Sequence, residues 1–107
     1  MKASIYIGND KLGEVIFSVI DESMGGIGGQ LIVNKKYKEY QHAIIEQCET
    51  KGISNIDDFN YRILLADNSE LKPKGGIGIS HLKQFEEIYV ESAGIDQMTI
   101  DKIRKYK

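Results

Sequence analysis

The sequence has one cysteine, Cys48, among its 107 residues. A disulfide within the chain needs two cysteines, so the disulfide frameworks of many small secreted domains are excluded. The chain does not open with a basic stretch followed by an apolar run, which argues against a signal peptide. It also lacks any run near the ~18 apolar residues that suggest a membrane-spanning helix. From these absences, and from the start at Met1, we expect a whole small cytoplasmic protein with no membrane partner.

Net charge is also low, at −2. Domains dedicated to nucleic acids are usually distinctly basic, so a nucleic-acid partner is not expected. The charge is uneven, because residues 101–107 hold four cations and one acid, a net of +3 that leaves −5 for the rest of the chain. We interpret this basic end as the last turn of a helix, where cations are favoured by the helix dipole. A basic interaction tail is the alternative.

The length and composition predict a single domain over residues 1–107. Apolar residues make up 41% and charged residues 28% of the chain, close to the average for globular domains. A chain of this length supports one modest hydrophobic core and little more.

The residue pattern in the first third of the chain predicts β-strands. Residues 3–7 and 14–20 are rich in β-branched and aromatic types, which suit a half-buried sheet. Residues 8–11, which begin Gly-Asn, suit the turn between them, so we expect a hairpin. The glycines within 25–29 indicate a loop, a bulge or the glycine-rich start of a strand. Residues 31–33 then predict a short third strand.

A helix is expected over residues 35–51. Aromatic and apolar side chains recur there every three or four positions, at Tyr37, Tyr40, Ile44 and Cys48. This spacing predicts an amphipathic helix with one face on the core. Asn34 is the expected N-cap, and Gly52 stands where a glycine often ends a helix.

The second half of the chain predicts three more strands and a short helix. Residues 60–66 form the first strand, and an extended piece begins at Leu71, at a sheet edge because Pro73 cannot donate to a ladder. One helical turn is expected over 80–85. Residues 87–92 form the last strand, with Ile88 and Val90 on one face and Tyr89 and Glu91 on the other.

After Gly94, Asp96 is the expected cap of a C-terminal helix that turns Ile100, Ile103 and Tyr106 inward. The predicted order is β-β-β-α-β-β-β-α. We therefore expect an α+β fold with a mostly antiparallel sheet of about six strands, one main helix and a short terminal helix.

The phrase Gly-Gly-Ile-Gly occurs twice, at 25–28 and 75–78, but the flanking sequences align poorly, which argues against an internal duplication. Glycine-rich loops can bind anions through backbone N–H groups. Neither phrase completes a P-loop or a dinucleotide-binding fingerprint. A small-ligand or anion-binding domain therefore remains an alternative hypothesis. Its backbone donors would be Gly25, Gly26, Gly28, Gly29, Gly75, Gly76 and Gly78.

Metal-binding and catalytic constellations are not evident, and we expect no metal and no cofactor. His42 and Cys48 lie six positions apart on the predicted helix, about 120° around it, so they do not converge. Nothing places a serine or Cys48 beside His42 or His81 with an orienting acid, as nucleophilic catalysis requires. We do not expect an enzyme.

The acidic segment before the first glycine cluster is the strongest candidate for function, because loops on a rigid scaffold often carry binding residues. Tyr37 and Tyr40 suit an adjacent groove, although their helical spacing favours the core. Our leading hypothesis is a protein-interaction module, and a homo-oligomer built by pairing sheet edges is a further alternative. The residues expected to bind the partner are Asp21, Glu22, Met24, Glu86 and Glu91.

Residues 21–31, read with Tyr37 and Tyr40, resemble a pattern in small uncharacterised bacterial proteins, over about residues 12–45. Some of those proteins resemble immunity or accessory proteins of toxin systems. The resemblance implies an immunity-like or regulatory role and carries over no functional residue. An acidic protein of that kind would pair with a basic partner through complementary charge.

Overall fold

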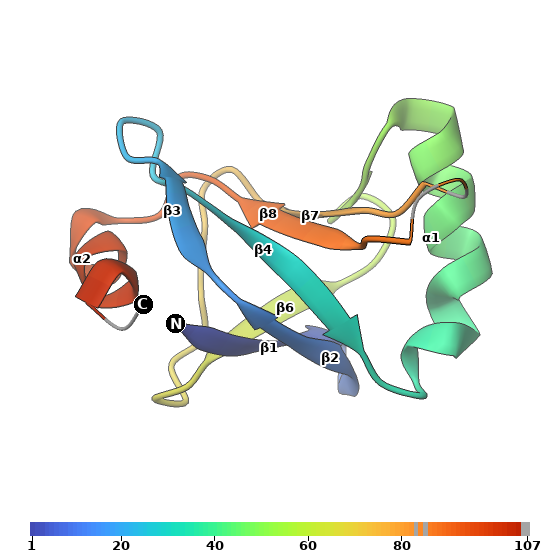
Figure 1. Ribbon diagram of the computed structural model, residues 1–107, viewed down its shortest axis with the longest axis horizontal. Helices are drawn as coiled ribbons and strands as arrows, with labels where there is room; N and C mark the ends of the chain where they lie inside the picture. The colour runs from blue at the N-terminus through green and yellow to red at the C-terminus, as the bar shows by residue number, and fades with distance from the viewer. Residues whose placement is uncertain (83, 85, 106–107) are drawn as a thin grey trace.

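The computed structural model describes residues 1–82, 84 and 86–105 (Figure 1). In this part of the chain, eight strands and two helices follow one another: β1 (Lys2–Ile7), β2 (Asp10–Ile16), β3 (Ser18–Asp21), β4 (Gly26–Val33), α1 (Tyr37–Lys51), β5 (Ser54–Asn55), β6 (Tyr61–Leu65), β7 (Ile77–Ser80), β8 (Tyr89–Ser92) and α2 (Gln97–Lys105). Each strand pairing between them is antiparallel. The predicted α+β class with an antiparallel sheet is confirmed.

The sheet has the strand order β5-β7-β8-β4-β2-β1-β6, and β3 also pairs with β4. It curls, with α1 and α2 at opposite ends of the molecule and the ribbon of β3 and β4 crossing the front between them (Figure 1). Two strands exceed the expected six. One is the two-residue β5, in a segment predicted to be a connection, and the other is β3, predicted as part of the strand over 14–20, while β7 takes the place of the piece predicted at Leu71.

That predicted strand is interrupted at Phe17, whose side chain is buried in the core. The N–H of Phe17 donates to the carbonyl of Met1, and the Met1 ammonium group donates to the Phe17 carbonyl. Pairing with β1 ends at these two hydrogen bonds, one residue beyond the Lys2–Ile16 pair. The turn that precedes β2 is tighter than expected, since β1 and β2 are joined through Gly8 (φ +58°) and Asn9 alone.

The glycine-rich segment is the start of β4. Gly25 closes the turn with φ +61°, and β4 then runs from Gly26 to Val33, five residues longer at its start than the strand predicted over 31–33. The interpretation of Gly26, Gly28 and Gly29 as a loop is wrong, and the glycine-rich strand start is correct. Close packing accounts for glycine here, because a Cβ on Gly29 would collide with the Ile16 carbonyl.

Helix α1 ends as predicted and begins two residues later than predicted. Gly52 is left-handed (φ +87°) and donates to the Cys48 carbonyl. Asn34 is not the N-cap, which is Lys36. Asn34 instead forms a turn ahead of the helix, accepting from the Lys36 N–H at 3.0 Å while its amide donates to the Lys11 carbonyl. The helix packs its buried residues Tyr37, Ile44 and Cys48 against the core.

In the second half of the chain, the structure differs from the prediction around Pro73. The piece at Leu71 is not a strand, although Leu71 N–H donates to the Ile63 carbonyl and Glu70 bridges to Leu64. The next strand, β7, begins at Ile77, after Pro73 and the glycine pair. Ser80 ends β7, and the helical turn predicted over 80–85 includes Lys83 and Phe85, which lie outside the described residues.

The C-terminal helix is confirmed, and it packs on the core. Asp96 accepts from the Thr99 N–H at 2.8 Å, and Ile100 and Ile103 are fully buried. Tyr106 lies outside the described residues. The interpretation of the basic end as a helix end is also confirmed, and two of its cations are already paired, Lys102 with Asp67 and Arg104 with Glu22. Neither described helix is long and apolar enough to span a bilayer.

Candidate functional site

The uncovered face of the sheet is the outer one, because the core fills the concave side. Side chains alternate between the two faces of a strand. On β8, Val90 and Ser92 are buried in the core, whereas Tyr89 and Glu91 face outward, as the sequence predicted. Pairing then places the other outward positions: Ile32, Gln30 and Gly28 on β4, Ile16 and Ser18 on the β2–β3 arm, and Ser80 and Gly78 on β7.

The two Gly-Gly-Ile-Gly phrases lie on either side of β8 in the same register. Ile27 and Ile77 both pair with Ser92, and all three side chains face the core. Gly28 and Gly78 both pair with Glu91 and face outward. The two copies of the phrase thus occupy equivalent positions on the two strands that flank β8. Glu91 therefore has a glycine beside it on each neighbouring strand.

Each of these glycines makes room for a side chain that folds over it. A Cβ on Gly28 would lie 2.5 Å from the Tyr89 hydroxyl oxygen and 2.9 Å from two of its ring carbons. A Cβ on Gly78 would collide with Cδ1 of Ile53. The phenol ring of Tyr89 and the side chain of Ile53 therefore occupy the space on the two sides of Glu91.

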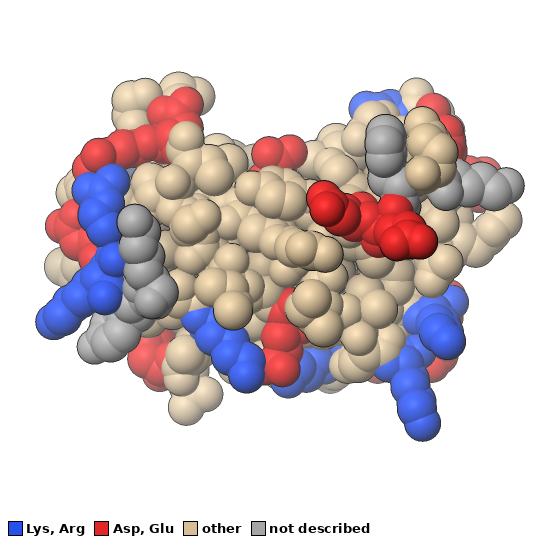
Figure 2. Space-filling model, in the orientation of Figure 1, with Lys and Arg blue, Asp and Glu red and all other residues tan. Residues whose placement is uncertain are grey.

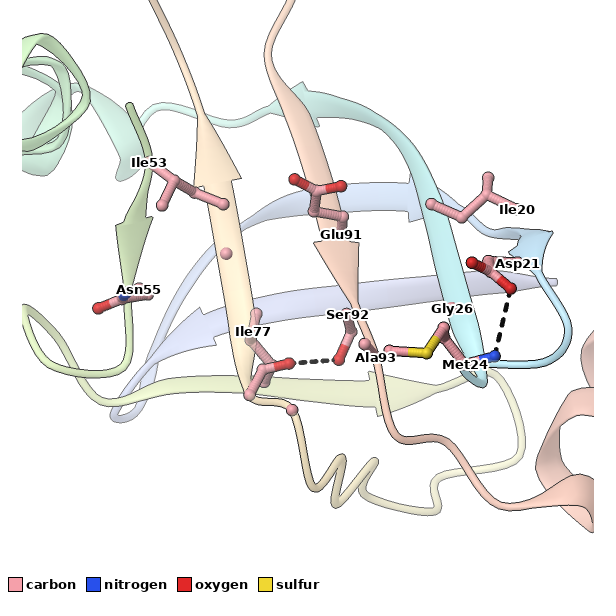
Figure 3. Close-up of a pocket in the computed structure, with 13 residues that line it drawn as sticks. Ile20, Asp21, Met24, Gly26, Ile53, Asn55, Ile77, Glu91, Ser92 and Ala93 are labelled. Atoms are coloured by element: carbon pink, nitrogen blue, oxygen red, sulfur yellow. Dashed lines mark hydrogen bonds between the residues drawn. The ribbon is translucent and has the colours of Figure 1, made fainter. Parts of the chain in front are cut away.

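A groove of about 420 Å³ runs along this face below Glu91 (Figure 3). Ile20 of β3 and Ile53 point into it from opposite sides, and Met24 extends toward Ala93 across β4. Its floor is backbone and small residues: Gly26, Gly75, Gly76, Gly78 and Ala93. The walls are apolar, and Asp21 and Glu91 add two carboxylates.

The carboxylates of Asp21 and Glu91 differ in the hydrogen bonds that they accept. Asp21 accepts from the Ser23 hydroxyl at 2.8 Å and from the Met24 N–H at 3.2 Å, and these hydrogen bonds lower the pKa of Asp21. Glu91 is half-buried and, among the residues that the structure describes, has neither a hydrogen bond nor an ion pair. Glu91 is therefore the acid of this groove that is open to a partner.

Three of the five residues predicted to bind a partner meet at this groove, namely Asp21, Met24 and Glu91. Glu22 is not among the residues that line it. Its carboxylate is paired with Arg104 of α2 at 2.9 Å, which lowers the pKa of Glu22. Glu86 lines a separate hollow together with Gln84 and Tyr89, so Tyr89 borders the groove of Glu91 without lining it.

The glycines predicted to bind an anion do not present converging donors. The N–H groups of Gly25, Gly75 and Gly76 donate to the carbonyls of Glu22, Ala93 and Pro73. Gly28 has paired strands on both sides, as does Gly78, and Gly26 and Gly29 also lie in paired strands. This arrangement gives the anion-binding hypothesis no support, because three of the donors are used by backbone carbonyls and the other four glycines lie in paired strands.

Tyr37 belongs to the core, as its helical spacing favoured. Its hydroxyl lies 2.7 Å from Nδ1 of His81, and Tyr40 donates to Asp10. His42 is exposed on α1, and Cys48 is buried with its Sγ near the Ile79 carbonyl. The described residues include no group of three histidine, cysteine or carboxylate side chains placed to hold a metal ion.

Tyr89, Ile20 and Ile53 were missed as site residues. For Tyr89 the sequence held a signal, because it alternates outward with Glu91. Ile53 follows α1 in a segment without periodicity, and its position over Gly78 depends on the pairing of β5 with β7. No protein-family model, curated protein or solved structure matches this chain, so the geometry of the groove and the outer face carries the functional argument.

Proposed function

We propose that this chain is a protein-interaction module that binds another protein through the outer face of its sheet. The observation that carries the proposal is a set of exposed apolar side chains on adjacent strands. Ile16 is 68% exposed, Ile32 67%, Ile20 51% and Tyr89 37%. We call these four residues the outer patch. Exposed apolar patches on soluble proteins are typical of interaction sites.

The outer patch is uncovered because the two helices lie elsewhere. In Figure 2 the surface over β3 and β4 is a broad area nearly free of charged side chains. Fully burying an isoleucine side chain contributes roughly 1.5–3 kcal/mol. A partner that covers these residues therefore gains binding free energy, because their side chains are still exposed to water in the folded chain.

Charge favours a partner with basic as well as apolar residues. Outside residues 101–107 the chain carries −5, and Lys102 and Arg104 are already paired with acids of the same chain. Complementary charge speeds encounter and sharpens specificity. An immunity-like or regulatory role toward a basic protein, in the cytoplasm, is consistent with this chemistry.

The test uses a photo-crosslinking amino acid in place of Ile32, in the cells that make the protein. Met98, which is 82% exposed on α2, provides the matched control position. We expect one protein to be crosslinked from position 32 and not from position 98. That protein is then purified, and its affinity is measured for the wild type, Ile32→Asp and Met98→Asp. We expect Ile32→Asp to weaken binding at least about tenfold, and Met98→Asp to leave it unchanged.

Equal binding by the wild type and Ile32→Asp would refute the outer face as the binding surface. A crosslink between two copies of this chain, together with a dimer in sedimentation, would assign the outer patch to self-assembly. That result would replace the present proposal with the homo-oligomer hypothesis.

A further inference from the structure

We infer that Glu91 and Tyr89 form a receptor for an arginine side chain presented by the partner protein. This inference rests on the proposed function and specifies the chemistry of its partner. It starts from the position of Glu91 within the binding face. Glu91 lies on β8 between Gly28 and Gly78, and Ile20 and Ile53 point toward it from the two sides (Figure 3).

A partner that covers the outer patch near Tyr89 and Ile20 must also cover Glu91, because Glu91 lies between them on the same face. Burial of an ionised carboxylate without a counter-charge is strongly unfavourable. The chain itself does not supply that charge, since no lysine or arginine is among the described residues that line the groove. A cation from the partner would supply the missing counter-charge for Glu91.

The neighbourhood of Glu91 favours arginine over lysine. The Tyr89 ring lies over Gly28, and directly opposed residues on paired strands have their Cβ positions only about 5 Å apart. The Tyr89 ring thus covers the β4 position that lies directly opposite Glu91. A guanidinium group can donate two parallel hydrogen bonds to a carboxylate and also stack on a ring, whereas an ammonium group is a point charge.

Gly28 is the residue that makes this arrangement possible. With any side chain at position 28, the Tyr89 ring must move from its present place beside Glu91. The apolar walls from Ile20 and Ile53 suit the methylene stem of an arginine, which packs against apolar surface while its charged end reaches a polar group. Ile20 belongs both to the groove and to the outer patch, so a partner that enters the groove also contacts the patch.

The experiment is a selection of random 12-residue peptides, displayed on phage, against the native full chain. We expect enriched peptides to contain one arginine flanked by apolar residues. Synthetic peptides from the selection are then measured by calorimetry. Glu91→Gln should weaken their binding at least about thirtyfold, as expected when one member of a covered charge pair is lost. Glu46→Gln, which removes an exposed acid on α1, should leave the affinity unchanged.

A second variant tests the role of the ring. Tyr89→Leu keeps an apolar side chain and removes the aromatic surface. In the wild type, replacement of the peptide's arginine by lysine should cost about fivefold in affinity, and in Tyr89→Leu this preference should disappear. An undiminished preference would overturn the assignment of Tyr89.

The outcomes separate the two proposals. Peptides that lose affinity for Ile32→Asp but bind Glu91→Gln as well as wild type would refute the arginine receptor and leave the outer face as the binding surface. Failure to select any peptide whose binding depends on Ile32 or Glu91 would count against both.

Discussion

The hydroxyl group of Tyr37 lies 2.7 Å from Nδ1 of His81, and both side chains are buried. This hydrogen bond joins the first turn of α1 to the residue that follows β7. Buried polar atoms without a partner destabilise a fold, so the pair is satisfied only while both members are present.

The first prediction concerns the loss of this hydrogen bond. Tyr37→Phe leaves His81 Nδ1 without its partner, and we expect the free energy of unfolding in urea to fall by about 1–3 kcal/mol. Tyr6→Phe, at a partly exposed position on β1, is the matched control and should change it by less than about 0.5 kcal/mol. Equal effects of the two substitutions would mean that the buried hydrogen bond contributes nothing specific.

The second prediction follows from the burial of His81, which lowers its pKa below the usual 6.5. The unfolded chain therefore binds a proton more readily than the folded chain does. The contribution of neutral His81 to the free energy of unfolding is therefore fully present above pH 6.5. It is lost progressively as the pH drops through 6.5 toward the lower pKa of the folded state. Unfolding in urea at pH 8, 6.5 and 5 should show this decline.

The histidine's share of that decline can be isolated with His81→Gln. This variant should be less stable at pH 8 and should lose less stability between pH 6.5 and 5. His42→Gln, at an exposed site on α1, should follow the wild-type curve. A wild-type slope retained in His81→Gln would assign the pH dependence to other groups.

The third prediction compares two glycines with nearly the same backbone angle. At Gly8 (φ +58°) an added Cβ would have nothing within 4 Å, whereas at Gly25 (φ +61°) an added Cβ would lie 2.7 Å from the Ile95 nitrogen. Gly8→Ala should cost about 1–2 kcal/mol for the left-handed conformation alone. Gly25→Ala should cost more, because the turn must also move away from Ile95. Thermal unfolding measures both, and equal shifts would show that crowding at Gly25 is unimportant.

Much of the fold was predictable because its signals are local. The hairpin, α1, β6, β8 and α2 each have a periodic pattern or a capping residue within their own sequence, as with Gly52 and Asp96. The errors occurred where the structure depends on distant contacts. The strand predicted over 14–20 is interrupted at Phe17, where its pairing with β1 stops, and Gly26, Gly28 and Gly29 form a strand because neighbouring strands pair with them.

The candidate site was predictable in part for the same reason. Asp21 and Met24 are close in sequence, and Glu91 was placed on the outward face of its strand by alternation. The meeting of these residues required the order of strands, which puts β8 between β4 and β7. Because the sequence does not reveal the strand order, it cannot show that Gly28 and Gly78 lie on the two sides of Glu91.

The fourth prediction concerns how α2 is attached. Ile103 is fully buried, whereas the ion pair of Arg104 with Glu22 joins side chains that are about half exposed, 47% and 52%. Exposed ion pairs contribute little. Ile103→Ala should therefore lower the free energy of unfolding by about 2–5 kcal/mol, and Arg104→Ala by less than about 1 kcal/mol. The reverse order in urea unfolding would mean that charge holds the helix in place.

The fifth prediction separates binding from stability on the outer patch. Ile32 is 67% exposed in the centre of the sheet, so its side chain contributes little to the core. Ile32→Thr keeps a β-branched side chain, which suits a strand, and removes apolar surface. We expect the free energy of unfolding to change by less than about 0.5 kcal/mol, as for surface substitutions generally.

The same substitution should weaken the binding of the protein crosslinked from position 32. Ile63→Thr, at a fully buried position on β6, is the matched control and should unfold the protein at a markedly lower urea concentration. If Ile32→Thr destabilised the chain as much as Ile63→Thr, this isoleucine would belong to the folded core. Unchanged stability with weakened binding would mean that the exposed isoleucine serves the partner rather than the fold.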